Sequence, residues 1–330
     1  MTRVMRLHGR ADRQQGFALL TVLLIVALVA LLSSQLVFSQ HLSLQRGTYM
    51  LHQSQSLAVA WGLEGWVKRG LLEDAKNNQT DHPGELWAQP LIKVPFEGGE
   101  ISGQLFDLQA RININNVQDS DEIKRKRWQR LLERWRELLE LPNPIADTVT
   151  DWVDSDEEPL PLGTESDVYL LKQPPYRTAN QPLVVLDELK MLQGFEGLTA
   201  AQWQAVQTSA TALPTVTAIN VNTADKTVLM ALADWMTEGV AQAWLQQRQQ
   251  QPADQVAVFT AFLAQQTGKT QAEIDADVPD WMLSVNSEYF LLLGEIAFGD
   301  SDQQVAAIFE RTAQNKVNLV QRWLSAAPAE

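Results

Sequence analysis

An uncharged apolar stretch near the N-terminus constrains this chain more than any other feature. Residues 17–38 read FALLTVLLIVALVALLSSQLVF and contain no formal charge. As a helix rising about 1.5 Å per residue, the stretch is long enough to cross a hydrocarbon layer of roughly 30 Å. Four arginines but only one acid precede it, so the positive-inside rule places residues 1–16 in the cytoplasm and the C-terminal part outside.

A secretory signal peptide is the obvious alternative, because it also joins a basic leader to an apolar run. Its apolar region spans about 7–15 residues and ends at a cleavage site of small residues. The run in this chain is longer, and the pattern over 39–63 remains helical. The sequence therefore favours a membrane helix that stays on the mature protein.

The junction RQQGF at residues 13–17 resembles the processing site of type IV prepilins. In that family a membrane peptidase cleaves after the glycine on the cytoplasmic side and methylates the new N-terminal residue. The resemblance implies cleavage between Gly16 and Phe17, N-methylation of Phe17, and retention of residues 17–38 as anchor and assembly helix. An uncleaved signal anchor, in which Gly16 is incidental, is the alternative.

The fifth residue after that junction is Thr21, where most pilins and pseudopilins carry glutamate. The resemblance implies that this glutamate pairs with the N-terminal amine of the subunit added before it. A charge among lipid-facing residues is costly without such a partner. A subunit that is added first has no earlier partner, so an uncharged Thr21 is expected at a filament tip. The other interpretation is that the chain is not a pilin.

Beyond the apolar stretch, strand-like segments lie on both sides of a helical block. Residues 39–76 continue the helical pattern, with glycines that suggest bends, and residues 91–114 alternate as a hairpin around a turn at 97–100. Residues 116–282 hold amphipathic helices, and residues 288–323 resemble a three-stranded meander. This order predicts an α+β, type IV pilin-like fold: a long N-terminal helix on a small antiparallel sheet, with a large all-α domain inserted in the head.

The predicted insertion divides the chain into five parts. It splits the head, so that its first and last segments meet in one sheet. The expected bounds are 1–16 for the cleaved leader, 17–38 for the transmembrane and assembly helix, 39–112 for the first part of the head, 113–283 for the inserted helical domain, and 284–330 for the final strands of the head.

The densest group of acids, DWVDSDEE at 151–158, is followed by Glu165 and Asp167. Crowded carboxylates repel one another unless a cation that prefers oxygen ligands neutralises them, and calcium tolerates irregular coordination better than magnesium. The spacing from Asp154 approaches that of an EF-hand loop, but proline replaces the required glycine. Two interpretations remain: a calcium site, or an exposed acidic loop in which Asp151 caps a helix.

Other features argue against an enzyme or a nucleic-acid binder. The chain has 26 basic and 40 acidic residues, and its formal net charge of −14 repels phosphate backbones. It has no cysteine, and no G-x-S-x-G or H-E-x-x-H motif. The stretch INVNTA at 219–224 resembles the opening of a helix-hairpin-helix module, but the acid Glu238 stands in its hairpin. A weaker echo at 111–115 suggests a duplicated helical unit.

Taken together, the chain is similar to the type II secretion system minor pseudopilins of the K type, also called general secretion pathway protein K. In that family the fifth mature residue is commonly not glutamate, and the pilin head carries a large inserted helical domain. The resemblance spans nearly the whole chain and rests on four stretches: QQGFALLTVLLIVALVAL (14–31), FDLQARININN (106–116), DWVDSDEEPLPLGTESDVYLLKQPPYRTANQPL (151–183) and INVNTADKTVL (219–229).

The resemblance implies a non-enzymatic protein of the inner membrane, held through residues 17–38, with its C-terminal domain in the periplasm. With minor pseudopilins I and J it would form the tip of the pseudopilus, prime its assembly, and engage exoproteins or the outer-membrane secretin. Prepilin peptidase would process it, and no nucleic acid is involved. The family's structural calcium is carried onto the matching acids, which are Asp154, Asp156, Glu165 and Asp167, with Asp151 a weaker match.

Two other classes of function stay open at this point. A membrane-anchored periplasmic metal-dependent enzyme would use the carboxylates of 151–167. A membrane-anchored DNA receptor would use the helix-hairpin-helix echo at 219–224. The sequence favours the pseudopilus tip over both.

Overall fold

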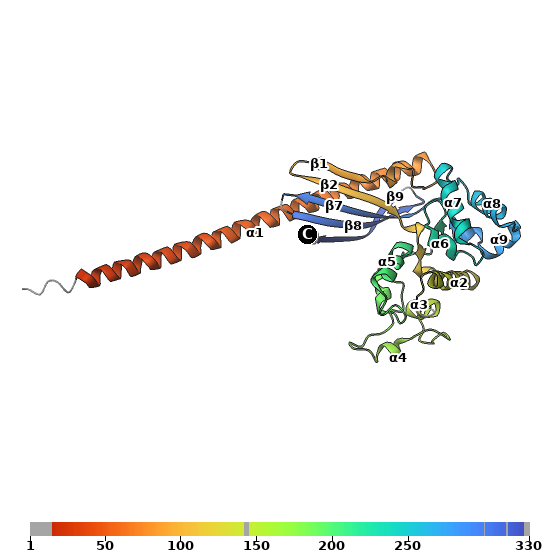
Figure 1. The fold of residues 1–330 in the computed structure, drawn as a ribbon, viewed down its shortest axis with the longest axis horizontal. Coiled ribbons are helices and arrows are strands. Elements are labelled where there is room, and N and C mark those ends of the chain that lie inside the picture. The colour runs from red at the N-terminus through yellow and green to blue at the C-terminus, as the bar shows by residue number, and fades with distance from the viewer. Residues whose placement is uncertain (1–14, 142–144, 300, 315, 327–330) are drawn as a thin grey trace, which may run out of the picture.

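The computed structural model describes residues 15–141, 145–299, 301–314 and 316–326. All but the last two positions of the expected leader, 1–16, therefore lie outside the described residues. Helix α1 (Gln15–Asn77) runs without a break through the apolar stretch and the segment after it. None of the glycines expected to bend this segment ends the helix. Figure 1 shows the first part of α1 projecting away from the rest of the molecule.

The projecting part of α1 presents its side chains outward on all sides. From Phe17 to Leu51, every residue except the partly buried Thr21 is exposed. Exposed apolar side chains around the whole circumference of a helix are typical of a segment that contacts lipid or other helices rather than its own domain. The structure therefore fits a membrane anchor at this end.

Five antiparallel strands form the sheet, in the order β1-β2-β7-β8-β9. Strands β2 and β7 pair along their full common length, from Gly99 opposite Phe298 to Asp107 opposite Phe290, although the helical block separates them in sequence. Gly98, with φ of 93°, closes the predicted hairpin between β1 and β2. The bounds are β1 Leu91–Phe96, β2 Gly99–Asp107, β7 Tyr289–Phe298, β8 Ser301–Thr312 and β9 Lys316–Ala326.

The C-terminal part of α1 packs on this sheet through one face. Ala60, Leu63, Val67 and Leu71 are buried and recur every three or four residues, as the helical period requires. Gly294 of β7 permits the close approach, because a Cβ there would lie 3.2 Å from a methyl group of Leu63. The helix is thus fixed to the sheet by apolar contacts along about three turns.

One buried ion pair also joins α1 to the far edge of the sheet. Glu64 on α1 accepts hydrogen bonds at both carboxylate oxygens from Arg322 on β9, and the second of these measures 2.6 Å. The carboxylate of Glu64 is 6% exposed, whereas the guanidinium of Arg322 is 31% exposed. A two-pronged pair of this kind fixes orientation as well as charge.

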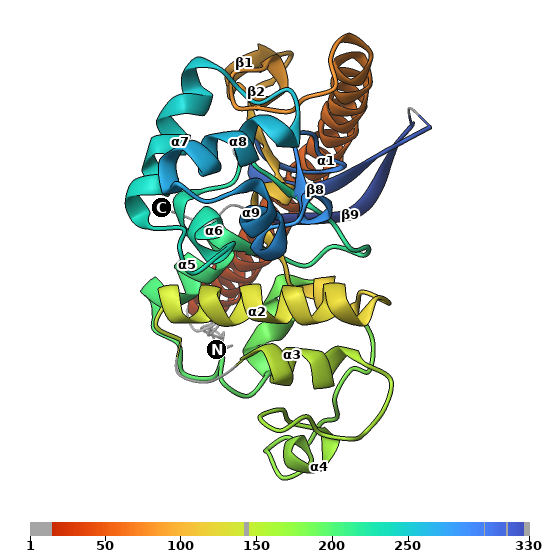
Figure 2. The same cartoon turned by 90° about the vertical axis from the view of Figure 1, so that its right-hand side faces the viewer.

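A block of helices lies between β2 and β7 in sequence and beyond the end of the sheet in space (Figure 1). In Figure 2, α2 lies across the block above α3, with α4 at the far end. The buried face of α2 consists of Trp128, Leu131, Leu132 and Trp135, which recur at the helical period. The α-helices are α2 Glu122–Leu138, α3 Ile145–Val153, α4 Ser166–Tyr169, α5 Ala200–Ser209, α6 Lys226–Ala231, α7 Glu238–Gln250, α8 Val256–Thr267 and α9 Gln271–Asp277.

Short strands and single turns complete the chain. The two-residue strands β3 (Ile112–Asn113) and β4 (Ala210–Thr211) pair in parallel, and so do β5 (Ile219–Asn220) and β6 (Leu283–Ser284). The sheet therefore ends at Asp107 and resumes at Tyr289, and the predicted division of the chain at 112 and 284 stays a prediction. The 3-10 turns are η1 Leu86–Ala88, η2 Leu108–Ala110, η3 Ile114–Gln118, η4 Leu186–Met191 and η5 Asp280–Met282.

Two asparagines make the same backbone clamp in the two halves of the block. Asn115 accepts a hydrogen bond from the backbone N–H of Leu183 and donates one to its carbonyl, both at 2.9 Å. Asn222 makes the equivalent pair with the backbone of Ala253, again at 2.9 Å. Each clamp follows one of the Ile-Asn strands, so the structure repeats the echo seen between 111–115 and 219–224.

Candidate functional site

The acidic loop between α3 and α4 brings three carboxylates together. Asp154 follows the last residue of α3, Asp156 lies in the loop, and Glu165 directly precedes α4. One carboxylate oxygen of each residue lies within 4.8 Å of those of the other two. Calcium binds oxygens at 2.3–2.6 Å, so one ion can span separations of about this size.

Two oxygens in this group lack a hydrogen-bonding partner among the residues that the structure describes. Oδ1 of Asp154 and Oε1 of Glu165 are buried and accept no hydrogen bond. Glu165 is only 2% exposed, and its other oxygen accepts a single bond from Thr178 Oγ1 at 3.4 Å. A buried acceptor without a donor costs free energy, which a bound cation would offset. An all-oxygen donor set is the one that hard cations prefer. The residues present therefore fit calcium.

The same surroundings raise the pKa of these acids. Burial, followed by repulsion from Asp156 and Asp151, raises the pKa of Asp154 to about 6. Burial, followed by repulsion from Asp151 and Asp154, raises the pKa of Glu165 to about 7. The loop thus holds its negative charge unfavourably unless a proton or a cation neutralises it.

Asp151 lies beside the group and organises the loop. It is fully buried within α3, and its carboxylate accepts the backbone N–H of Leu160 at 3.2 Å. The alternative interpretation, in which Asp151 caps a helix, was wrong, because Asp151 lies inside α3 and its side chain holds the loop that returns toward that helix. Burial is the main cause that raises its pKa to about 6. Gly163 is required here, since a Cβ at that position would lie 1.9 Å from Asp151 Oδ2.

The loop differs from the predicted ligand set at three positions. Asp151 and Asp167 were predicted ligands but lie outside the converging group, and Asn180 was not predicted. Asp167 is exposed on α4, where its carboxylate accepts its neighbour's N–H, that of Val168, and it is not part of the converging group. Asn180 was not among the predicted ligands, yet its buried amide oxygen has no donor and its N–H group contacts Asp156 O at 3.4 Å. Amide oxygens are calcium ligands. The signal was present, since Asn180 stands in the stretch 151–183.

Near the N-terminal junction, the hydroxyl of Thr21 finds its hydrogen-bonding partners within its own helix. The Thr21 hydroxyl donates to Ala18 O at 2.9 Å and lies 3.2 Å from Phe17 O. A threonine whose hydroxyl bonds to the preceding turn needs no further partner in lipid. Cleavage between Gly16 and Phe17 and methylation of Phe17 stay predictions.

The stretch that resembles a helix-hairpin-helix module is buried. Asn220, Val221 and Asn222 are each 0% exposed. Asn220 donates to Asp81 O at 3.1 Å and to Asp107 Oδ2 at 3.0 Å, which joins the helical block to the head. This segment is packed in the interior of the protein, so it offers no surface to a DNA backbone.

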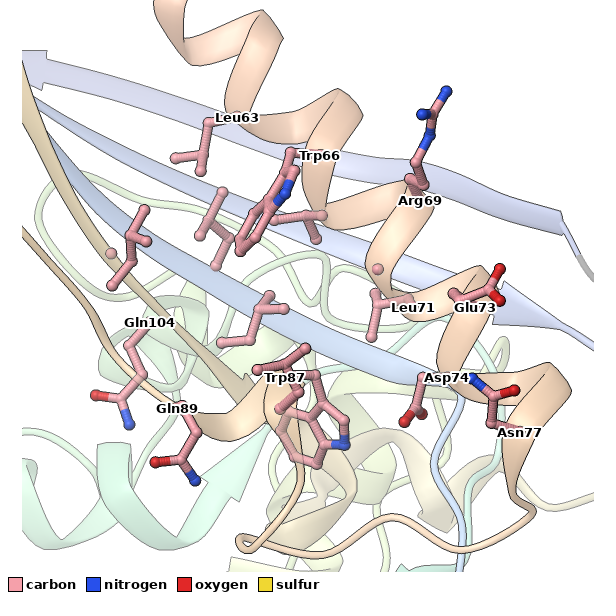
Figure 3. A pocket seen from close by; sticks show the side chains of 17 residues that line it. Leu63, Trp66, Arg69, Leu71, Glu73, Asp74, Asn77, Trp87, Gln89 and Gln104 are labelled. Carbon is pink, nitrogen blue, oxygen red and sulfur yellow. The ribbon is translucent and has the colours of Figure 1, made fainter. Parts of the chain in front are cut away.

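An apolar pocket of about 330 Å³ lies between the end of α1 and the strands β1 and β2. Figure 3 shows Trp66 and Trp87 along it, Gln89 and Gln104 at one end, and Asp74 near the other. Its walls offer apolar contact area rather than a paired acid and base. It does not indicate a catalytic centre.

The helical block matches a known protein family in two places. Residues 110–215 and residues 219–278 both match the family described as type II secretion system (T2SS), protein K. The two matches together cover half of the chain. The chain belongs to the type II secretion system protein K family.

Full-length relatives agree with this assignment. Type II secretion system protein K of Pseudomonas aeruginosa is 30% identical over 322 residues, which cover 94% of this chain and 92% of that protein. The protein of the same name from Klebsiella pneumoniae is 32% identical over 324 residues, covering 94% and 96%. A chain in the crystal structure of the GspK-GspI-GspJ complex from the enterotoxigenic Escherichia coli type 2 secretion system superposes with a TM-score of 0.72 at 25% identity. That match covers 86% of this chain and all of the other.

These similarities confirm the resemblance to a minor pseudopilin of the K type and the α+β fold predicted for it. The chain is thus a component of a type II secretion system, and among the described residues its N-terminal helix is the one that is long and apolar enough to anchor it in a membrane. The relatives are named as secretion system proteins and not as enzymes. Neither the anchored enzyme nor the DNA receptor is favoured.

Proposed function

We propose that this minor pseudopilin forms the tip of the type II secretion pseudopilus together with pseudopilins I and J. The observation that carries the proposal is the position of the helical block, which lies at the opposite end of the molecule from the start of α1 (Figure 1). A filament grows by stacking subunits along their N-terminal helices. A bulky block beyond the head leaves no room for a further subunit above it, which suits the last position of the filament.

Two other features support the same position. The related structure is a complex that contains GspI and GspJ, so I and J of the same secretion system are the expected partners. Thr21 places no charge in the membrane and bonds within its own helix, as a subunit without an earlier neighbour requires.

In this proposal the protein primes assembly and supports export of folded proteins, and it catalyses no reaction. The proposed orientation places its C-terminal domain in the periplasm and its anchor in the inner membrane, after prepilin peptidase has removed residues 1–16. Exoproteins and the outer-membrane secretin are the contacts proposed for the exposed tip.

Deletion of the gene for this chain in its own organism tests this function. We expect exported proteins to accumulate in the periplasm, because the pseudopilus would lack its tip, and we expect the full chain to restore their release. Fractionation of periplasm and medium followed by immunoblotting measures both. Unchanged release in the deletion strain would contradict the proposal.

We also propose a structural calcium ion at the acidic loop. Asp154, Asp156 and Glu165 would hold it through carboxylate oxygens, and Asn180 through its amide oxygen. Calcium would neutralise charge that the fold otherwise buries unfavourably. The chain's own contribution is to position these oxygens, with Asp151 fixing the return of the loop.

The stabilisation by calcium will depend on pH. Burial raises the pKa of Glu165 from 4.5 to about 7, so without a cation its ionisation destabilises the fold progressively between those values. Bound calcium offsets the destabilisation caused by ionised Glu165. The stabilisation by calcium is therefore largest above pH 7 and decreases toward pH 5. At a hundredfold excess over Kd we expect about 2.7 kcal/mol, or a rise in Tm of about 5–10 °C at pH 8.

Thermal melts in calcium and in chelator, at pH 5 and pH 8, measure this effect. Glu165→Gln should abolish the response to calcium, whereas Asp167→Asn, at an exposed position outside the group, serves as the matched control and should keep it. Equal Tm values in calcium and in chelator at pH 8 would contradict the proposed calcium site.

A further inference from the structure

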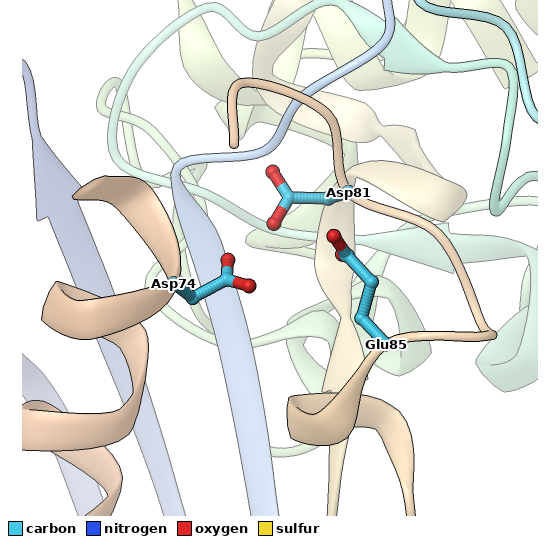
Figure 4. Close-up of side chains that lie close together, drawn as sticks. All are labelled: Asp74, Asp81 and Glu85. Atoms are coloured by element: carbon cyan, nitrogen blue, oxygen red, sulfur yellow. The ribbon is translucent and has the colours of Figure 1, made fainter. Parts of the chain in front are cut away.

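A second group of acids lies where α1 ends, well apart in sequence from the acidic loop. Asp74 is in the last turn of α1, and Asp81 and Glu85 lie in the segment that follows (Figure 4). One oxygen of each carboxylate lies within 4.8 Å of those of the other two. Three carboxylates at this distance require a neutralising partner.

Asp81 is the most constrained of the three. It is 1% exposed, and its Oδ2 accepts hydrogen bonds from Ser287 N at 2.7 Å and from the guanidinium of Arg311. Its Oδ1 is buried and accepts no hydrogen bond. The described chain thus leaves one oxygen of a buried carboxylate without a partner, which is costly unless something outside the chain satisfies it.

The charges around the group do not balance. Arg311 is the only arginine or lysine paired with it among the described residues, donating to Asp74 Oδ2 at 2.9 Å and to Asp81. His82 accepts the N–H of Gly84 at Nδ1, and its Nε2 lies 3.9 Å from Glu85 Oε1. One guanidinium against three carboxylates leaves an excess of two negative charges. A single divalent cation would neutralise that excess.

Glu85 is held in place by neutral donors. Trp87 Nε1 and the backbone N–H of His82 donate to its Oε2 at 2.6 Å and 3.0 Å. These bonds fix the side chain without supplying positive charge. The side-chain amide of Asn78 donates to its other oxygen, Oε1. No arginine or lysine of the described residues pairs with Glu85, so these bonds from the loop hold it beside Asp74 and Asp81.

We propose that Asp74, Asp81 and Glu85 form a second divalent-cation site, suited to calcium. All donors are oxygens, and separations up to 4.8 Å match a cation with 2.3–2.6 Å bonds better than magnesium, whose 2.0–2.1 Å bonds span about 4.2 Å. This site goes beyond the proposed function and is independent of the acidic loop.

The site would connect the membrane helix to the helical block. Asp74 belongs to α1, whereas Asp81 donates its backbone N–H to Val285 O at 2.8 Å and accepts from Ser287 on the segment that leads into β7. A cation bound to both would join the last turn of α1 to the junction between head and block. Removal of the cation would loosen that junction.

Counting bound calcium on the full chain in detergent tests the site. By equilibrium dialysis with labelled calcium we expect two equivalents for the wild type, one for Glu165→Gln, one for Asp81→Asn, and none for the double variant. If Glu165→Gln binds as much as the wild type, the acidic-loop site fails and this one is unaffected. If Asp81→Asn binds as much as the wild type, the second site is overturned.

Terbium luminescence gives a second readout that reports position. Trp87 contacts Glu85 directly, so excitation of tryptophan should sensitise terbium bound at this site in a Glu165→Gln background. Trp87→Phe should lose most of that emission while binding the same number of ions, and Glu85→Gln should lose both emission and binding. Glu85→Gln also replaces Asp81→Asn if the latter does not fold by circular dichroism.

Absence of sensitised emission, together with one calcium equivalent in the wild type, would overturn the site. That outcome would instead favour a proton shared between Asp74 and Asp81.

Discussion

Gly16→Leu will leave the leader on the chain. The proposed cut lies between Gly16 and Phe17, and a large side chain at the cleaved position would obstruct the peptidase where glycine presents no side chain. We expect complete loss of processing rather than a partial decrease. Export should fail with it, because a basic leader would remain at the end of α1 that packs into the filament.

Intact-mass measurement of the protein purified from membranes distinguishes the forms, since the cleaved chain begins at methylated Phe17. Gln15→Ala is the matched control and should be processed like the wild type. A wild-type chain that retains Met1 in cells with active peptidase would contradict the processing site. Normal cleavage of Gly16→Leu would contradict the role of Gly16.

Asn222→Ala will strongly destabilise the helical block. The side chain is 0% exposed and satisfies both the N–H and the carbonyl of Ala253. Its removal leaves two buried backbone groups unpaired at about 1–3 kcal/mol each, so we expect a loss of about 2–6 kcal/mol in the free energy of unfolding. Asn115→Ala should behave similarly, because it removes the equivalent clamp on Leu183.

Chemical denaturation of the purified chain, followed by tryptophan fluorescence, measures these losses. Asn318→Ala is the control, since that side chain makes one exposed hydrogen bond, to Glu310 at 3.2 Å, and its loss should cost under about 0.5 kcal/mol. If Asn222→Ala and Asn318→Ala shift unfolding equally, the clamp does not stabilise the block.

Much of the fold could be predicted because it rests on local periodicity. In the buried face of α2, apolar residues recur at the period of a helix, and in the hairpin around Gly98 they alternate as in a strand. The apolar run before them is continuous and long enough to be a membrane helix. The division of strands around the helices also indicated that β2 and β7 belong to one sheet. The glycines of α1 do not interrupt the helix. Apolar contacts with the sheet stabilise it around Gly62, Gly65 and Gly70.

The sites were harder to predict because they depend on which way each side chain turns in the fold, and sequence spacing does not show this. Asp167 follows Glu165 closely in sequence but turns outward on α4, so spacing alone could not exclude it. Asp74, Asp81 and Glu85 are near one another in sequence but are separated by polar and neutral residues, so no acid-rich run marks them. Only the fold turns them toward one another and brings up Arg311, which lies more than two hundred residues away.

The central claim is that this chain caps the pseudopilus with pseudopilins I and J. Co-expression with the cognate I and J, purification through a tag on this chain in calcium, and measurement of the native mass test it most directly. The account predicts one stable complex with one copy of each protein. Recovery of this chain folded but alone, with I and J both present in the same membranes, would contradict it.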